Sequence, residues 1–272
     1  MKEFLLEDIG TGDLTVSSIF REDVKVSGEF IAKAEGILCG IEIPALVYEI
    51  LGKATFTPFV EDGQKVCKGE VIGLAEGSVS TLLTGERVVL NLMQRMSGIA
   101  TKTRKAIERL DDSSIKLCDT RKTAPGLRLF DKYAVKTGGG RNHRFGLYDG
   151  VMLKDNHLSY AGGLKEAVEK VRYIQGQMVK VEVEVETEEQ LLKAIEAEVD
   201  IIMLDNRSPQ EIFEWRKMIP DEILVEISGE ITMENIHKFK GCGAQFLSMG
   251  ELTHSVIALD ISFLDAVGEK KI

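Results

Sequence analysis

The chain has 272 residues, of which 44% are hydrophobic and 29% are charged, and its net charge is −10. This length is enough to bury a large core in one or two domains, so neither disulfides nor structural metals are needed for folding. The acidic balance excludes a diffuse binder of nucleic acid or of an anionic membrane, and no apolar run of about 18 residues predicts a transmembrane helix.

The first part of the chain, up to about residue 82, consists of short β-rich pieces that glycines interrupt. We expect strands at residues 26–34, 37–41, 53–60 and 71–75. The stretch 62–71 is typical of a hairpin in lipoyl-type sandwiches. It has no lysine placed like an attachment site, so we interpret it as a structural turn.

A long helix is predicted next, over residues 86–110. Apolar residues recur there at spacings of three and four, which gives the helix one buried face. Thr84 is placed to cap its start by accepting a backbone N–H bond. Gly98 lies in the middle of this helix, where glycine costs up to about 1 kcal/mol relative to alanine, and close packing against another segment would explain it.

After residue 110 the sequence alternates between short apolar segments and amphipathic ones. Residues 164–174, 188–197, 210–218 and 233–239 predict helices, and six other segments predict strands. Repeating β-α units imply a parallel sheet, either open or closed as a barrel. The six predicted strands are residues 115–119, 151–154, 180–185, 201–205, 224–228 and 246–250.

Each predicted strand of this region has polar residues or glycine at its carboxyl end. In parallel α/β folds, ligands bind at this end of the sheet. One such residue could simply mark a strand that enters a solvated loop, but the pattern at all six strands predicts a shared site. Its members are Arg121, Lys122, Lys154, Glu184, Asp205, Ser228, Gly229 and Gly250.

Residues 181–186 alternate valine with glutamate, which places three valines on one face of the strand and three glutamates on the other. A solvated glutamate face fits an exposed antiparallel strand better than a β-α repeat, in which both faces are usually covered. At least one of these glutamates is therefore expected to point at a cation, a ligand hydroxyl or a metal.

The segment 119–157 has the densest charge, with eight basic and four acidic side chains in a chain that is acidic overall. Such a cluster predicts recognition of a small polyanion, because arginine donates two parallel bonds to a carboxylate or phosphate; a solvated loop with paired charges is the alternative. The sequence has no P-loop, no HExxH motif and no zinc-type spacing of His and Cys. Carboxylates near phosphate-binding groups instead suit Mg²⁺ as cofactor.

Two further patterns bear on location. The N-terminal residues lack the apolar stretch and the cleavage site of a signal peptide. The four cysteines lie far apart and form no CxxC pair, which is typical of reduced thiols. We therefore expect a cytoplasmic protein without nucleic-acid or membrane partners.

Several motifs, in order along the whole chain, carry a resemblance to one family. Together they resemble quinolinate phosphoribosyltransferases, and the long block in the middle is highly specific. The matching stretches are EDIGTGDLT at 7–15, NLMQRMSGIAT at 91–101, DTRKTAPGLR at 119–128, KYAV at 132–135, GGG at 138–140, NHR at 142–144, KDNH at 154–157, LDN at 204–206 and LTHS at 252–255.

This resemblance implies a fold and a reaction. The fold is α/β: an N-terminal sandwich over residues 1–102, completed by 253–272, and an incomplete parallel α/β barrel of six to seven strands over 103–252. The reaction transfers a phosphoribosyl group from phosphoribosyl pyrophosphate (PRPP) to quinolinate with loss of CO₂. Its products are nicotinate mononucleotide, a precursor of NAD, and pyrophosphate, and it uses Mg²⁺.

The resemblance also implies roles for individual residues. Lys122, Lys154, Glu184 and Asp205 would be catalytic, with the two acids binding ribose hydroxyls and Mg²⁺. A homodimer would place Arg95 in the partner's site, and a hexamer of dimers is compatible with this. The remaining substrate-binding residues would be Thr120, Arg121, His143 and Arg144 at the carboxylates and phosphates, and Ser228, Gly229 and Gly250 at the 5′-phosphate.

Two residues depart from the family pattern. Glu230 stands where members usually have the second glycine of a Ser-Gly-Gly run, and Glu251 follows Gly250 where members usually have a small residue. A carboxylate repels a phosphate, so we expect both glutamate side chains to point away from the site.

Three alternatives remain open at the level of sequence. A paralogue associated with molybdate transport shares the fold and the Arg-Lys-Thr motif but acts on a different acceptor. Lys154 could be the Schiff-base lysine of an aldolase. A non-catalytic relative should have lost some of the charged set, and every member of that set is present here.

Overall fold

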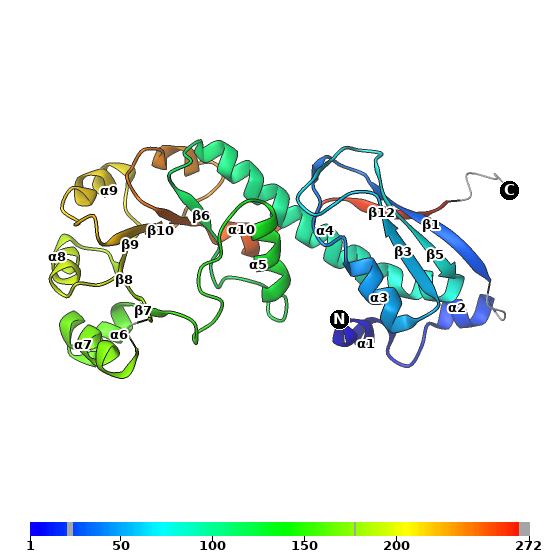
Figure 1. The fold of residues 1–272 in the computed structure, drawn as a ribbon, viewed down its shortest axis with the longest axis horizontal. Helices are drawn as coiled ribbons and strands as arrows, with labels where there is room; N and C mark the ends of the chain where they lie inside the picture. The colour runs from blue at the N-terminus through cyan, green and yellow to red at the C-terminus, as the bar shows by residue number, and fades with distance from the viewer. Residues whose placement is uncertain (21–23, 177, 267–272) are drawn as a thin grey trace. The chain divides into compact units, whose positions relative to one another are not determined.

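The computed structural model describes residues 1–20, 24–176 and 178–266, and these form two compact units (Figure 1). The first unit contains Met1–Lys102 and the described residues from Val256 to 266, and the second contains Thr103–Ser255. Residues 267–272, part of the segment predicted to complete the first domain, lie outside the described residues. Within the described part, no helix is both long enough and apolar enough to cross a bilayer.

The first unit is built on a four-stranded antiparallel sheet in the order β12-β1-β5-β3. Its strands are β1 (Lys25–Ala32), β3 (Ala54–Pro58), β5 (Val71–Ser78) and β12 (Ile261–Asp265), and β2 (Gly36–Ile37) pairs separately with β4 (Lys65–Val66). In the second half of β1 burial alternates, and Phe30 packs its ring against Phe56 and Phe263. The strands predicted at 26–34, 53–60 and 71–75 are confirmed with shifted ends, whereas the strand predicted at 37–41 is only the two-residue β2.

Three helices of the first unit were not predicted: α1 (Lys2–Ile9), α2 (Leu14–Ile19) and α3 (Ile43–Leu51). Helix α2 begins with a side-chain cap, in which Asp13 accepts a hydrogen bond from the Val16 amide. Helix α3 has a proline in its first turn and buries Val47 and Tyr48. Each is at most nine residues long, too short for an apolar repeat to stand out in the sequence.

The long helix α4 spans Val79–Leu110, so it starts seven residues before the predicted position. Strand β5 ends at Ser78 and the helix follows directly. Thr84 therefore lies inside the helix, and the prediction that it caps the start is wrong; its hydroxyl lies 3.3 Å from Asp13 Oδ2. Close packing at Gly98 is confirmed, because a Cβ there would lie 2.2 Å from the carbonyl oxygen of Ile257.

The second unit contains six parallel strands in the order β6-β11-β10-β9-β8-β7. All six predicted strands are confirmed to within about two residues. Three helices match their predictions closely, namely α7 (Leu164–Ile174), α8 (Glu188–Glu196) and α9 (Pro209–Arg216). The predicted helix at 233–239 is instead a short 3₁₀ turn, Ile236–Phe239. The strands are β6 (Lys116–Cys118), β7 (Val151–Leu153), β8 (Val181–Val185), β9 (Ile201–Asp205), β10 (Leu224–Ser228) and β11 (Phe246–Ser248).

Helices connect the successive strands of the second unit, except that a 3₁₀ turn lies between β10 and β11, and one further helix follows the last strand (Figure 1). Such β-α connections bring the carboxyl ends of all six strands to one edge of the sheet, where a ligand site is expected. The helices are α5 (Arg128–Thr137), α6 (Asp155–Ala161), α7 (Leu164–Ile174), α8 (Glu188–Glu196), α9 (Pro209–Arg216) and α10 (Glu251–His254).

A buried ion pair ties the loop after α5 to the end of β6. Lys132 on α5 lies 2.5 Å from the Asp119 carboxylate, and both side chains are at most 2% exposed. The same carboxylate accepts hydrogen bonds from the Asn142 side chain and the His143 amide, and Lys132 also donates to the His143 carbonyl at 2.9 Å. This network fixes the backbone that carries residues 142–144.

Replacing Lys132 with methionine is expected to destabilise the protein by about 3–5 kcal/mol, because it leaves Asp119 buried without its cation. Urea unfolding measures the change. Lys136→Met on the exposed side of the same helix is the matched control and should be nearly neutral. Equal effects of the two substitutions would show that the buried pair does not hold this region together.

Candidate active site

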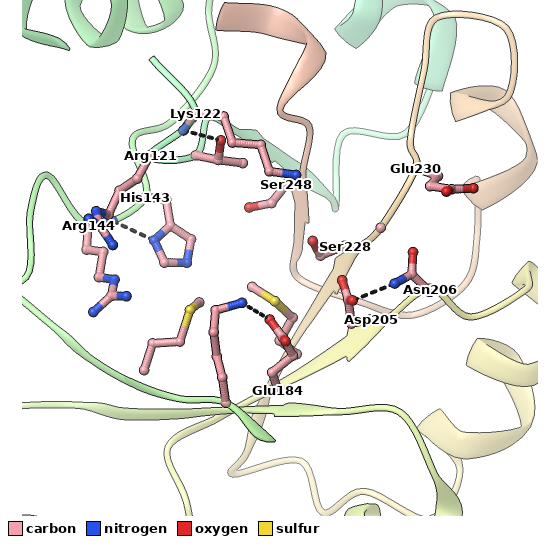
Figure 2. Close-up of a pocket in the computed structure, with 15 residues that line it drawn as sticks. Arg121, Lys122, His143, Arg144, Glu184, Asp205, Asn206, Ser228, Glu230 and Ser248 are labelled. Atoms are coloured by element: carbon pink, nitrogen blue, oxygen red, sulfur yellow. Dashed lines mark hydrogen bonds and ion pairs between the residues drawn. The ribbon is translucent and has the colours of Figure 1, made fainter. Parts of the chain in front are cut away.

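A cavity of about 420 Å³ lies at the carboxyl ends of the strands in the second unit (Figure 2). It brings together most of the residues that the sequence predicts for the site. Arg95 and Gly250 are not among its lining residues: Arg95 is half-buried on α4, and Gly250 lies against the Lys122 side chain. The predicted residues that line the cavity are Thr120, Arg121, Lys122, His143, Arg144, Lys154, Glu184, Asp205, Ser228 and Gly229.

One side of the cavity is strongly cationic. Burial, and next the positive charge of Arg121, lower the pKa of Arg144, so the two guanidinium groups are close enough to repel one another. Arg144 is held by a hydrogen bond of 2.9 Å from its guanidinium to the Gly150 carbonyl. Lys122 follows a local turn in which its amide donates to Thr120 Oγ1 at 3.0 Å. Cations fixed beside one another in this way favour a bound anion.

The opposite side of the cavity carries the acids. Glu184 at the end of β8 forms an ion pair with Lys154, which follows β7. This bears out the prediction that a glutamate of this strand points at a cation. Asp205 at the end of β9 accepts a hydrogen bond of 2.7 Å from the Asn206 side chain. Carboxylate oxygens of Glu184, Glu186 and Asp205 lie within 4.8 Å of one another, a donor set that suits a hard cation such as Mg²⁺.

Beyond β9 and β10, two loops are packed so tightly that only glycine fits at position 229. A Cβ on Gly229 would lie 2.2 Å from the side-chain oxygen of Asn206, and the backbone there has a φ of 96°. The backbone N–H of Asn206 in turn donates a hydrogen bond of 3.0 Å to the Ser228 carbonyl. The backbone of residues 228–229 can therefore line the cavity at close range, as a phosphate cradle requires.

Glu230 and Glu251, the two residues that depart from the family pattern, have different surroundings. Glu230 is exposed and contributes to the rim of the cavity, and Figure 2 shows its carboxylate directed away from the cationic side chains. Glu251 does not line the cavity, and its carboxylate accepts a hydrogen bond of 3.1 Å from the Met233 amide. Neither glutamate therefore points into the cationic part of the cavity.

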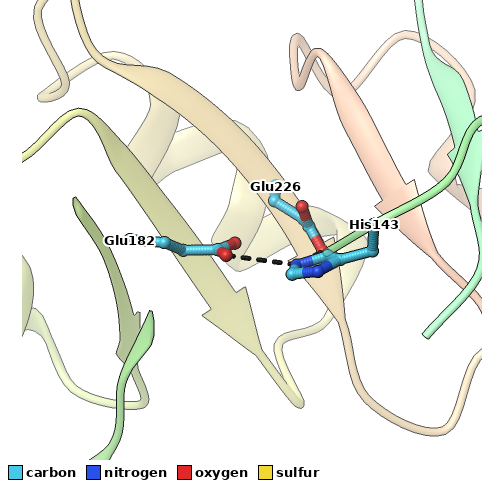
Figure 3. Close-up of side chains that lie close together, drawn as sticks. All are labelled: His143, Glu182 and Glu226. Atoms are coloured by element: carbon cyan, nitrogen blue, oxygen red, sulfur yellow. Dashed lines mark ion pairs between the residues drawn. The ribbon is translucent and has the colours of Figure 1, made fainter. Parts of the chain in front are cut away.

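His143 has protein partners at both ring nitrogens (Figures 2 and 3). Nδ1 accepts a hydrogen bond of 2.7 Å from the Arg144 amide, and Nε2 lies 3.1 Å from Glu182 and 3.5 Å from Glu226. Burial lowers the pKa of His143, but the hydrogen bond to Glu182 and the charge of Glu226 outweigh it, so the pKa is raised overall. The ring lines the cavity without directing a nitrogen at it in this arrangement.

Sequence reasoning missed several residues here. Met152, Met203, Asn206 and Ser248 line the cavity, and Glu226 lies beneath it. A usable signal existed for Glu226, because it is a single acid inside an apolar strand. For Ser248 the signal was weaker. It consists only of the alternation along the strand, which places Ser248 on the inward-facing side.

Comparison with known proteins decides the family. The model of the quinolinate phosphoribosyl transferase C-terminal domain matches residues 99–264, and the model of the N-terminal domain matches residues 13–97. The chain belongs to the quinolinate phosphoribosyltransferase family. Members of this family are transferases, and the resemblance seen in the sequence is confirmed.

Individual relatives match over most of their length. A probable nicotinate-nucleotide pyrophosphorylase (carboxylating) of Bacillus subtilis is 52% identical over 96% of this chain and 91% of that protein. A chloroplastic nicotinate-nucleotide pyrophosphorylase of Arabidopsis thaliana is 41% identical over 96% of this chain and 80% of its own. The solved structure of the nicotinate-nucleotide pyrophosphorylase from Francisella tularensis is 39% identical to this chain and superimposes with a TM-score of 0.91. The match covers 97% of this chain and 93% of that chain. The expected α/β fold of the family is therefore confirmed.

Proposed function

We propose that this chain transfers the phosphoribosyl group of PRPP to quinolinate, with loss of CO₂, and so forms nicotinate mononucleotide for NAD biosynthesis. The observation that carries this proposal is the division of one cavity into a cationic side and an acidic side. Arg121 and Arg144 suit the carboxylates of the acceptor, and Glu184 and Asp205 suit the sugar. Family membership supports the same reaction, whereas no observation favours the molybdate-associated alternative.

The proposed chemistry needs no protein nucleophile, because the pyridine nitrogen of quinolinate attacks the ribose carbon that releases pyrophosphate. Departure of pyrophosphate builds positive charge on the sugar, which nearby carboxylates stabilise as they do in glycoside hydrolysis. In this proposal Glu184 and Asp205 take this role. Lys122 and Lys154 would balance the phosphates and the negative charge that develops on the ring carbon when the 2-carboxylate leaves as CO₂. A proton from water then takes the place of the carboxylate on that carbon.

A magnesium ion is part of this proposal. Glu184 and Asp205 would hold it, with the remaining ligands supplied by substrate oxygens and water, which is how proteins usually bind Mg²⁺. When bound, the ion would neutralise the pyrophosphate. Glu186 lies close enough to contribute, although it was not predicted to do so.

The assembly and location are proposals as well. We infer a homodimer in which Arg95 enters the partner's site, and a hexamer of dimers is compatible with it. The proposal of a cytoplasmic enzyme is supported by the spacing of the four cysteines, which lie far apart in the sequence and form no CxxC pair.

The acceptor is the sharpest test of this function. Quinolinate carries two adjacent carboxylates and nicotinate only one, so nicotinate would leave a desolvated cation unpaired. Such a loss costs about 2–5 kcal/mol, and nicotinate turnover should be lower by a factor of about 30 or more. Competing PRPP-dependent assays, with product separated by chromatography, measure the ratio. Equal turnover of the two acceptors would refute the assignment.

A further inference from the structure

Two carboxylates lie beneath the active-site cavity and have no part in the proposed chemistry. Glu182 on β8 and Glu226 on β10 are at most 5% exposed, and they meet at His143 (Figure 3). The nearest nitrogen of His143 and one oxygen of each carboxylate lie within 4.8 Å of one another. Burial of two acids is costly unless each is hydrogen-bonded, so this cluster requires an explanation.

The contacts of His143 determine where its ring proton lies. The Arg144 amide donates to Nδ1 at 2.7 Å, and a proton on Nδ1 would occupy the same space. The ring proton therefore belongs on Nε2, which lies 3.1 Å from Glu182 Oε2. His143 is thus the donor to Glu182, and its other nitrogen is an acceptor for its own neighbour in the chain.

Glu226 completes the cluster from the other side. Its Oε1 accepts a hydrogen bond of 2.5 Å from Ser248, and Oε1 of Glu182 is buried with no hydrogen-bond partner among the described residues. Burial, and next the negative charge of Glu182, raise the pKa of Glu226 to about 7. Glu226 therefore lies beside Glu182 in the same cluster, and Oε2 of Glu182 is the oxygen that faces Nε2 of His143.

We propose that Glu182 and Glu226 are positioning residues, which hold His143 in one orientation and thereby fix the backbone from which Arg144 enters the cavity. Arg144 is then held at two points, by its amide through His143 and by its guanidinium through Gly150. The proposal rests on the proposed function in one respect, because Arg144 acts there on the carboxylates of the acceptor. In this account His143 is itself a positioning residue.

Steady-state kinetics of two variants separates this role from simple core packing. Glu182→Ala removes the acceptor of a buried N–H group, so the KM for quinolinate should rise by about ten-fold or more. The KM for PRPP should stay close to that of the unmodified protein. Glu226→Gln keeps the shape of the side chain, so it should retain most of the activity. Glu222→Gln, on an exposed residue ahead of the same strand, is the matched control.

The orientation of His143 can be measured without any turnover. The chain has four histidines, so ¹⁵N labelling of histidine gives a simple spectrum, and His143→Gln assigns the signal. At mildly alkaline pH we expect a neutral ring with its proton on Nε2, both in the unmodified protein and in Glu226→Gln. The position of the ring proton tests the proposal even if quinolinate is not the acceptor. It also tests the proposal if Glu182→Ala fails to fold.

Two results would overturn the proposal. One is a proton on Nδ1 of His143 in the unmodified protein, because the Arg144 amide could not then donate to it. The other is a folded Glu182→Ala variant whose KM for quinolinate is unchanged. If the unmodified protein has no activity toward quinolinate, that result would instead count against the proposed function. The spectrum of His143 would still decide the positioning role.

Discussion

Removing the charge of Glu184 or Asp205 is expected to lower kcat by about 10²- to 10³-fold, while the protein stays folded. The substitutions are Glu184→Gln and Asp205→Asn, which keep the shape of the side chain and remove the carboxylate that the proposed function assigns to the sugar. The loss should appear in kcat, because positive charge develops on the ribose mainly in the transition state.

Stability should change far less than activity in these two variants. Glu184 pairs with Lys154, whose side chain is 45% exposed, so breaking this pair costs roughly 0–1 kcal/mol. Thermal unfolding is the control that separates a chemical effect from misfolding. Unchanged kcat in both variants would remove the two acids from the mechanism, and a large loss of stability would assign them a structural role.

Two inactive variants are expected to restore activity when they are mixed. Arg95→Ala and Lys154→Ala should each be inactive, because the proposed site combines Lys154 of one subunit with Arg95 of the other. A heterodimer would contain one site with both lesions and one site with neither. Random exchange of equal amounts gives about half heterodimers, so roughly a quarter of the normal activity should return.

This complementation distinguishes a shared site from a surface arginine. Arg95 is half-buried between the buried residues Leu92 and Met96 on α4, a position that does not itself require a role across an interface. Native mass spectrometry confirms that subunits have exchanged. Exchanged mixtures that stay inactive would show that Arg95 acts within its own chain or has no part in the reaction.

The strands and the outline of the site could be predicted from sequence for a simple physical reason. Parallel strands joined by helices place their carboxyl ends together, so polar residues that end successive strands must gather at one edge. Lys154, Glu184 and Asp205 follow this rule. Nothing about their three-dimensional contacts was needed to group them, only the count of residues along each strand.

What sequence reasoning missed depends on register between strands and on side-chain orientation. Glu182 and Glu226 face the same interior point because β8 and β10 both pair with β9, and a single-residue shift would separate them. The orientation of His143 follows from the local bond to the Arg144 amide, which no spacing rule predicts. The start of α4 was misplaced because Thr84 resembles a cap although the strand before it passes directly into the helix.

The most direct test of the whole account is a balance of products from quinolinate labelled in its 2-carboxylate. With PRPP and Mg²⁺ present, the account predicts that labelled CO₂, pyrophosphate and nicotinate mononucleotide appear in equal amounts. Omission of PRPP should abolish all three. Release of CO₂ without PRPP, or transfer of the phosphoribosyl group to quinolinate without release of CO₂, would contradict it.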